Sequence, residues 1–250
     1  MSVKLFSKMD RKKDIFLSII IPVFNEEKRV KNLIEVASYL KRQKYSWEVI
    51  VIDDGSIDKT NAKLKLLKRK QRFKLITYIP NFGKGYAIKT GMLAAEGKYR
   101  LFLDVDLSTP ITEIEKLLPH LRKYDIIIGS RKMKGANLVI RQPILRESLG
   151  KLFTLLSRKT MGMNISDFTC GFKCFSKKAA LQIFPLQTIN RWGFDSEILY
   201  ISKLKKHSIK ELPVTWKDDP RTKVRFPHDI LKSLEELIRI RINFHRGMYK

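Results

Sequence analysis

Residues 99–110 read YRLFLDVDLSTP, and this stretch decides how the rest of the chain is interpreted. A short apolar run, typical of a strand buried on both faces, ends at two aspartates, Asp104 and Asp106. Two carboxylates one residue apart repel each other and raise each other's pKa unless a cation lies between them. A lysine, an arginine or a metal ion would each supply that charge, so this strand end predicts a charged site.

Similar apolar runs occur along the first half of the chain, with amphipathic stretches between them. The further strands are predicted at 17–23, 48–53, 74–79 and 125–129, and helices near 26–42, 58–72, 84–96 and 112–122. Regular alternation of strand and helix predicts an α/β fold with a doubly wound, mostly parallel sheet and helices on both faces.

Polar motifs follow the predicted strands at the point where each one ends. These motifs are PVFNEE, DDGS, DVD and GSR, in chain order. In a parallel sheet the ligand crevice lies outside the carboxyl ends of the strands, so the motifs are expected to meet in one active site. Two of these regions also have a purely structural explanation. DDGS could form a turn at Gly55 followed by a helix N-cap at Ser56, and the residues after DVD, Ser108 to Pro110, could begin a helix.

The second half is less regular. Residues 143–159 place Leu145, Leu149, Leu152, Phe153 and Leu156 on one helical face, among many basic residues. Such a helix either packs in the core or lies in a membrane interface. A strand at 211–216 and an amphipathic helix at about 229–243 close the chain.

The composition narrows the classes of partner. The 250 residues include 51 Lys and Arg against 25 Asp and Glu, a formal net charge of +26. Such an excess indicates a polyanionic partner: nucleic acid, an anionic membrane surface or a phosphate-bearing substrate. Two cysteines and four histidines do not form a zinc set, and the cysteines are expected to be reduced. No apolar run reaches the roughly 18 residues of a membrane span, so a cytoplasmic location is expected.

Six segments together resemble glycosyltransferase family 2 with a GT-A fold. They are IIIPVFNEE, VIDDGSIDKT, NFGKGYAIKTGMLAAEGKYRLFLDVDLSTP, GSR, DFTCGFKCF and RWGFDSEILY, and they occur in this order over roughly residues 15–245. Within the family the chain is most similar to the polyprenyl-phosphate sugar transferases, above all the dolichyl-phosphate β-glucosyltransferases. The resemblance implies one GT-A domain over 1–250, with a nucleotide-sugar half (15–130) and an acceptor and membrane-proximal half (131–250).

The resemblance assigns donor roles to several residues. In the family the D-x-D element holds Mg²⁺ or Mn²⁺ on the diphosphate of a nucleotide-sugar, which implies Asp106 as direct ligand, Ser108 as helper and Asp104 nearer the ribose. Asp54 would accept a hydrogen bond from the base, beside Pro22, Phe24 and Glu26. Lys84, at a helix start, suits an anion.

The acceptor side is assigned in the same way. Arg131, Arg146 and Lys223 match positions that grip phosphates in relatives, although a solvated surface charge is the alternative for each. Asp167 and Asp195 would position the acceptor or support the site, with a purely structural role equally open. Asp104, Asp106 and Arg131 are the residues expected to carry catalysis.

The function that follows is a metal-dependent, inverting transfer of a hexose from a nucleotide-sugar, glucose from UDP-glucose above all, to a polyprenyl or dolichyl phosphate. The alternatives are another donor (GDP-mannose, UDP-galactose or UDP-N-acetylglucosamine) or a saccharide acceptor. The enzyme would sit peripherally on the cytoplasmic face of a membrane, alone or with an integral-membrane partner. A nucleic-acid-binding protein is disfavoured, because it leaves the aspartate-rich strand ends without a purpose.

Overall fold

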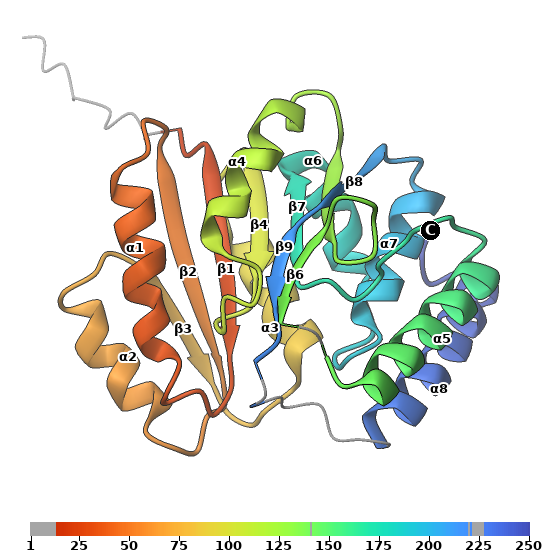
Figure 1. Ribbon diagram of the computed structural model, residues 1–250, viewed down its shortest axis with the longest axis horizontal. Helices are drawn as coiled ribbons and strands as arrows, with labels where there is room; N and C mark the ends of the chain where they lie inside the picture. Colours follow the sequence, from red (N-terminus) through yellow and green to blue (C-terminus); the bar gives the residue numbers. More distant parts are fainter. Residues whose placement is uncertain (1–13, 141, 220, 222–227) are drawn as a thin grey trace, which may run out of the picture.

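The computed structural model describes residues 14–140, 142–219, 221 and 228–250 (Figure 1). The strands are β1 (Leu17–Val23), β2 (Trp47–Asp54), β3 (Lys74–Tyr78), β4 (Tyr99–Leu103), β5 (Ile126–Ser130), β6 (Asn137–Ile140), β7 (Phe172–Ser176), β8 (Ile209–Pro213) and β9 (Thr215–Lys217). The α-helices are α1 (Leu33–Lys41), α2 (Thr60–Lys68), α3 (Lys84–Ala94), α4 (Ile114–Leu117), α5 (Ile144–Met161), α6 (Lys177–Ile183), α7 (Phe194–Leu204) and α8 (His228–His245).

The predicted mostly parallel sheet is confirmed. Seven strands lie in the order β3-β2-β1-β4-β7-β5-β8, and a separate pair joins β6 to β9. Within the large sheet β7 runs antiparallel to both of its neighbours, β4 and β5, while the other pairings are parallel. The carboxyl ends of β1, β2, β4 and β5 therefore share one edge of the sheet.

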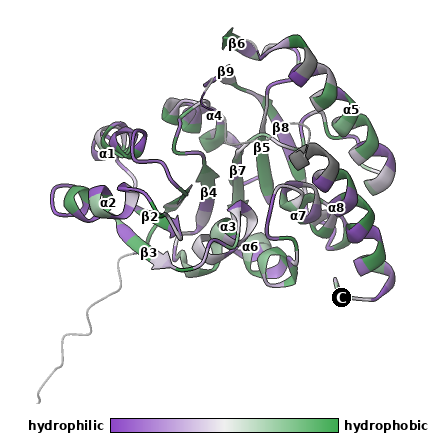
Figure 2. Ribbon diagram, turned by 90° about the horizontal axis from the view of Figure 1, so that it is seen from below, coloured by the Kyte–Doolittle hydropathy of each residue, from purple (hydrophilic) through white to green (hydrophobic). Residues whose placement is uncertain are grey.

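In the interior strand β1 the run Ile19 to Ile21 is apolar on both faces because helices cover both. Ile20 packs with α3, α6 and α7 in one core cluster, whereas its neighbours Ile19 and Ile21 pack with α1, α2 and α4 in another. Successive side chains of a strand point to opposite faces, so an unbroken apolar run is what two covered faces require. Figure 2 shows the two helical layers, with α3 and α6 opposite α1 and α4.

Two predicted elements differ from the structure, and a strand inside the sheet was missed. The segment 172–176 was not predicted as a strand, yet β7 lies in the middle of the sheet. The single strand expected at 211–216 is two strands, β8 and β9, which belong to different sheets. The long helix expected at 112–122 is a four-residue α4 between two short 3₁₀ turns, the second of which carries Pro119 in its first turn.

Two predicted helix caps are wrong. Ser56 lies in the turn before α2, whose N-cap is Lys59, and the 3₁₀ turn after DVDLST begins with Pro110 as N-cap rather than Ser108. The turn at Gly55 is confirmed, since its φ of 72° lies in the region that glycine adopts without strain.

The α5 helix does not have the single apolar face that was expected. Phe153 is buried, whereas its neighbour Leu152 is 48% exposed, because adjacent residues are about 100° apart around a helix. The helix packs beside α7 and α8 (Figure 1), and its other side leaves Leu155 62% and Ile144 85% exposed. Within the described residues, no helix combines the length and apolar character that crossing a bilayer requires.

Candidate active site

A cavity of about 1330 Å³ opens at the carboxyl edge of the sheet. The residues predicted from the sequence that line it are Pro22, Phe24, Glu26, Asp54, Lys84, Asp104, Asp106, Ser108, Arg131, Arg146 and Asp195. Asp167 lies behind Arg131 with its side chain fully buried. Lys223 lies outside the described residues. The strand ends thus meet around one space, as expected, while the role of each residue stays a prediction.

The cation beside the first aspartate of DVD is a lysine. Lys84 is the first residue of α3, and its Nζ lies 2.5 Å from Oδ1 of Asp104. Burial alone would lower the pKa of Lys84, but the charges of Asp104 and Asp195 and the hydrogen bond to Asp104 together outweigh it and raise the pKa. Lys84 also lies 5.9 Å from the ring centre of Trp192. Asp104 and the start of α3 are therefore joined across the cavity mouth.

Asp106 has no such partner within the described part of the chain. Its Oδ1 accepts a hydrogen bond from the backbone N–H of Ser108, at 2.9 Å. Burial raises the pKa of Asp106, and the charge of Asp104 adds to the increase. A second cation at Asp106 would offset both effects.

The residues present fit a divalent cation that is shared with a substrate. The described residues include no group of three or more His, Cys, Asp or Glu that could hold a metal ion alone. Mg²⁺ commonly takes one or two carboxylates and fills its remaining positions with water and substrate phosphates. The backbone leaves room for this arrangement, because a Cβ at Gly171 would collide with the carboxyl group of Asp104.

The carboxylate of Asp54 binds the loop that follows β3. It accepts hydrogen bonds from the side chain of Asn81 at 2.6 Å and from the backbone N–H groups of Phe82 and Gly83, both at 2.9 Å. Burial raises the pKa of Asp54 against the effect of these backbone donors, which lower it. Asp54 thus shapes the wall next to Lys84, and its contact with a base stays a prediction.

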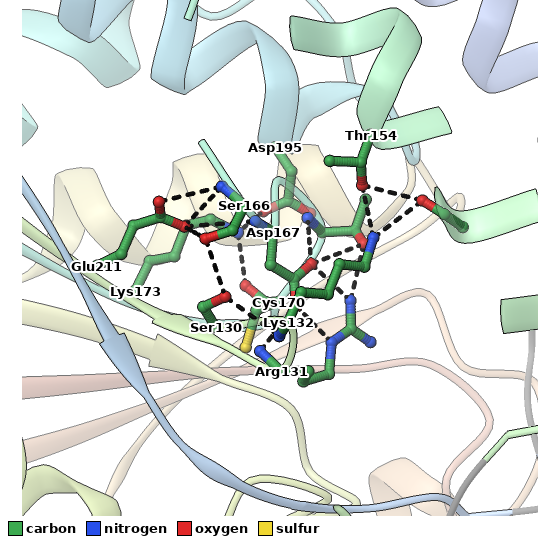
Figure 3. A network of polar contacts seen from close by, with 12 residues as sticks. Ser130, Arg131, Lys132, Thr154, Ser166, Asp167, Cys170, Lys173, Asp195 and Glu211 are labelled. Carbon is green, nitrogen blue, oxygen red and sulfur yellow. Dashed lines mark hydrogen bonds and ion pairs between the residues drawn. The ribbon is translucent and has the colours of Figure 1, made fainter. Parts of the chain in front are cut away.

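Arg131, which follows β5, is fixed by a buried carboxylate (Figure 3). Its Nε and Nη2 donate to the two oxygens of Asp167 at 2.7 and 2.8 Å, and Nη2 also donates to Thr169. The guanidinium group lies 5.4 Å from the ring centre of Trp216. Burial alone would raise the pKa of Asp167, but the charges of Arg131 and Lys132 and the hydrogen bonds from Arg131 together outweigh it and lower the pKa well below its usual range. Among the described residues none bonds to Nη1 of Arg131.

A second buried pair, Lys173 with Asp195, belongs to the same polar network (Figure 3). Lys173 of β7 is fully buried, and its Nζ contacts Oδ1 of Asp195 and the carbonyl oxygen of Cys170, both at 2.5 Å. Burial raises the pKa of Asp195 despite the opposing charges of Lys173 and Lys84. Cys170 and Cys174 are both buried and free, consistent with the reduced cysteines that were expected.

Two further ion pairs tie distant segments to the cavity wall. Arg146 of α5 lies 3.3 Å from Asp218. Arg29 contacts both Glu26 at 2.9 Å and Asp219 at 3.0 Å, so Glu26 is part of an ion-pair network.

Sequence reasoning missed several residues of this wall. Lys132 lines the cavity and donates to Thr154 and to the carbonyl oxygen of Gly150, and Trp216 covers Arg131. Lys173 carried a usable signal, since a lysine inside the apolar run FKCF indicates either an exposed strand or a buried partner. The others carry no local signal.

Comparison with known proteins agrees with this geometry. A family model described as glycosyl transferase family 2 matches residues 18–184. The chain is 33% identical to the dolichyl-phosphate beta-glucosyltransferase of Saccharomyces cerevisiae, over 95% of this chain and 77% of that protein. It is also 33% identical to the human protein of the same name, over 94% of this chain and 77% of the relative.

Solved structures show the same fold at lower identity. Glucosyl-3-phosphoglycerate synthase from Mycobacterium tuberculosis, in complex with Mn²⁺, UDP-glucose and phosphoglyceric acid, superposes with a TM-score of 0.67 at 17% identity. The match covers 92% of this chain and 79% of that chain. The same enzyme with Mg²⁺ and UDP gives a TM-score of 0.62 at 18% identity.

Proposed function

Because the chain belongs to glycosyl transferase family 2 and is a glycosyltransferase, we propose that it transfers glucose from UDP-glucose to a polyprenyl or dolichyl phosphate. The transfer inverts the anomeric carbon, depends on a divalent cation and yields a lipid-linked monosaccharide. The names of the relatives at 33% identity support the reaction, and the UDP-glucose and Mn²⁺ bound by a protein of the same fold support the donor and the metal.

One observation carries the proposal: a single cavity joins a carboxylate pair to a cationic, partly apolar wall. Asp104, Asp106 and Lys84 lie on one side of it. On the other side α5 contributes Arg146 together with apolar side chains, namely Leu149, Phe153 and Leu155. A nucleoside diphosphate sugar suits the first side, and a phosphate attached to an apolar chain suits the second.

At the donor side Asp106 and Asp104 would hold the divalent cation, with Ser108 beside them. The cation would complete its coordination with the donor's diphosphate and neutralise charge on the departing UDP. Lys84 adds a fixed positive charge at the start of α3, where the helix dipole also favours an anion.

At the acceptor side Arg131 is held ready for a phosphate. Asp167 and Thr169 occupy its Nε and Nη2, which fixes the plane of the guanidinium group and leaves Nη1 for a ligand. Arg146 and Lys132, which line the same cavity, add positive charge. Lys223 would join them, as the resemblance implies.

The chemistry requires no strong general base. A phosphate monoester has a second pKa of about 6, so the acceptor is already an anionic nucleophile at neutral pH. What the chain must do is hold that oxygen in line with the anomeric carbon and stabilise the leaving diphosphate. Arg131 orients the nucleophile, while Lys84 and the DVD carboxylates act on the leaving group. Asp195, buried between Lys173 and Lys84, keeps this wall in place.

The α5 side of the cavity also suggests how the enzyme binds to a membrane that contains its lipid substrate. Ile144, Leu152 and Leu155 are exposed on α5, and residues 131–159 hold eight basic residues against one acidic one. Exposed apolar side chains among cations favour an anionic membrane surface, where each basic residue contributes about 1 kcal/mol. The proposed location is therefore peripheral, on the cytoplasmic face of a membrane, alone or with an integral-membrane partner.

Measuring transfer to different acceptors distinguishes this function from its alternatives. Purified enzyme is incubated with radiolabelled UDP-glucose, Mg²⁺ and one of three acceptors in detergent: a polyprenyl phosphate, 3-phosphoglycerate or an oligosaccharide. The proposal predicts label in the organic phase with the polyprenyl phosphate and little transfer to the other two. Faster transfer to 3-phosphoglycerate or to the saccharide would replace the lipid acceptor.

A further inference from the structure

The α8 helix brings a carboxylate to the donor side of the cavity. Glu236 lies on this helix, outside the residues 18–184 that the family model matches, and it lines the cavity. Its Oε2 accepts a hydrogen bond from the backbone N–H of Gly193, at 2.6 Å. Gly193 directly precedes α7, the helix that carries Asp195 in its first turn.

The contact is close enough to require glycine on the other side. A Cβ at position 193 would lie 2.6 Å from Cβ and 2.7 Å from Oε2 of Glu236, shorter than real side chains approach. The φ of Gly193 is −74°, so its backbone conformation alone would accept any residue. It is therefore space for Glu236 that excludes other residues at 193.

Neighbouring contacts locate Glu236 relative to the DVD element. Trp192, next to Gly193, lies under the ammonium group of Lys84, which in turn pairs with Asp104. A short chain of contacts thus runs from Asp104 to Glu236 along one wall. Among the described residues the Gly193 contact is the only hydrogen bond of the Glu236 carboxylate, so its Oε1 keeps its acceptor capacity.

The Glu236 carboxylate favours a ligand group that can donate a hydrogen bond. The diphosphate of a nucleotide-sugar offers acceptors and negative charge, which Glu236 would repel, whereas the hydroxyl groups of the sugar offer donors. We propose that Glu236 determines donor specificity by accepting a hydrogen bond from a hydroxyl group of the transferred hexose. This inference rests on the proposed function and adds a residue that reads the sugar itself.

The competing explanation is that Glu236 only fixes the loop at Gly193. A loop defect would lower activity with every donor by the same factor. A direct contact lowers activity only with donors that carry the recognised hydroxyl, because a site built to bind a hydroxyl group rejects the analogue that lacks it.

The experiment changes the Glu236 side chain and removes the hydroxyl groups of the donor sugar one at a time, so that the effects of the two changes can be compared. The kcat/KM of wild type and Glu236→Gln is measured with UDP-glucose and with its 2-, 3-, 4- and 6-deoxyglucose analogues, using polyprenyl phosphate as acceptor. Glutamine can still accept the Gly193 N–H through its amide oxygen, but it then turns a donor toward the cavity. Glu235→Gln, an exposed neighbour on the same helix, is the matched control.

For wild type we expect a roughly 10- to 100-fold loss with one analogue, the size of a hydrogen bond to a charged group. Glu236→Gln should show a loss of this size with UDP-glucose and almost no further loss with that same analogue. The melting-temperature shift given by UDP alone should be unchanged, and Glu235→Gln should behave as wild type.

Equal additional losses in Glu236→Gln and wild type for all four analogues would overturn the proposal while leaving the proposed function standing. A wild-type enzyme that transfers no glucose would overturn the proposed function, and this inference with it.

Discussion

Replacing Asp167 by asparagine tests whether the acceptor side depends on a buried charge. The carboxylate is fully buried and accepts two hydrogen bonds from the guanidinium group of Arg131, at 2.7 and 2.8 Å, while the Arg131 side chain is 18% exposed. Breaking a buried pair by removing one partner costs about 3–5 kcal/mol, and the partial exposure of Arg131 places the value near the lower end. We expect Asp167→Asn to lower the free energy of unfolding by about 3 kcal/mol, measured by urea denaturation at pH 7.

The pH dependence identifies the charge as the cause. The pKa of Asp167 is depressed in the folded protein, so its contribution is complete above the ordinary value of about 4 and is lost as the pH falls further. The difference between wild type and Asp167→Asn should therefore stay constant from pH 7 to about 5 and shrink below about pH 4. Loosening Arg131 should also raise the KM for the acceptor more than it lowers kcat.

The matched control is Asp218→Asn, which removes one partner of Arg146. That pair has a single contact at 3.3 Å, and Arg146 is 31% exposed, so the loss should be about 1 kcal/mol or less. If Asp167→Asn costs no more than Asp218→Asn at pH 7, the reasoning that Asp167 holds a buried charge is refuted.

Three further results are expected. Removing divalent cations with EDTA should abolish transfer, and adding Mg²⁺ or Mn²⁺ should restore it. The Asp106→Asn variant should lose turnover but keep the wild-type melting temperature. Full activity in EDTA would contradict the proposed metal dependence. UDP should raise the melting temperature more than GDP, and Asp54→Ala should remove the difference, whereas an equal or larger shift with GDP would favour a guanosine donor. Binding to anionic liposomes should weaken with added salt and with the double change Leu152→Ser and Leu155→Ser, but not with Leu181→Ser, which changes a leucine on α6 about as exposed as Leu152. Wild-type protein that stays in solution at low salt would contradict the membrane-surface location.

The sequence predicted the strands in which apolar residues predominate. The boundaries of β1 match the prediction, and each boundary of β2 differs from it by one residue, because two covered faces leave little choice of residue type. The strand β7 escaped prediction since it carries Lys173, a residue that rarely lies in a central strand. Its charge is tolerated because Asp195, 22 residues further along the chain, lies beside it. Local pattern cannot reveal such a partner.

In the active site, too, some residues could be predicted from the local sequence and others could not. Residues at strand ends could be placed together, because parallel strands bring their carboxyl ends to one edge. Partners from other segments could not: Asp218 with Arg146, Asp219 with Arg29, and Glu236 with its glycine each depend on how distant segments pack. The predicted face of α5 failed for a related reason, since packing against α7 and α8 decides which of its leucines are covered.

We propose that this cavity binds UDP-glucose and a lipid phosphate and transfers glucose from the first to the second. The most direct measurement supplies purified enzyme with polyprenyl phosphate, Mg²⁺ and, in separate reactions, labelled UDP-glucose, UDP-galactose, UDP-N-acetylglucosamine or GDP-mannose. We expect a glucosylated lipid that forms fastest from UDP-glucose and carries a β linkage, as determined by NMR. Faster transfer from another donor, or an α-linked product, would contradict it.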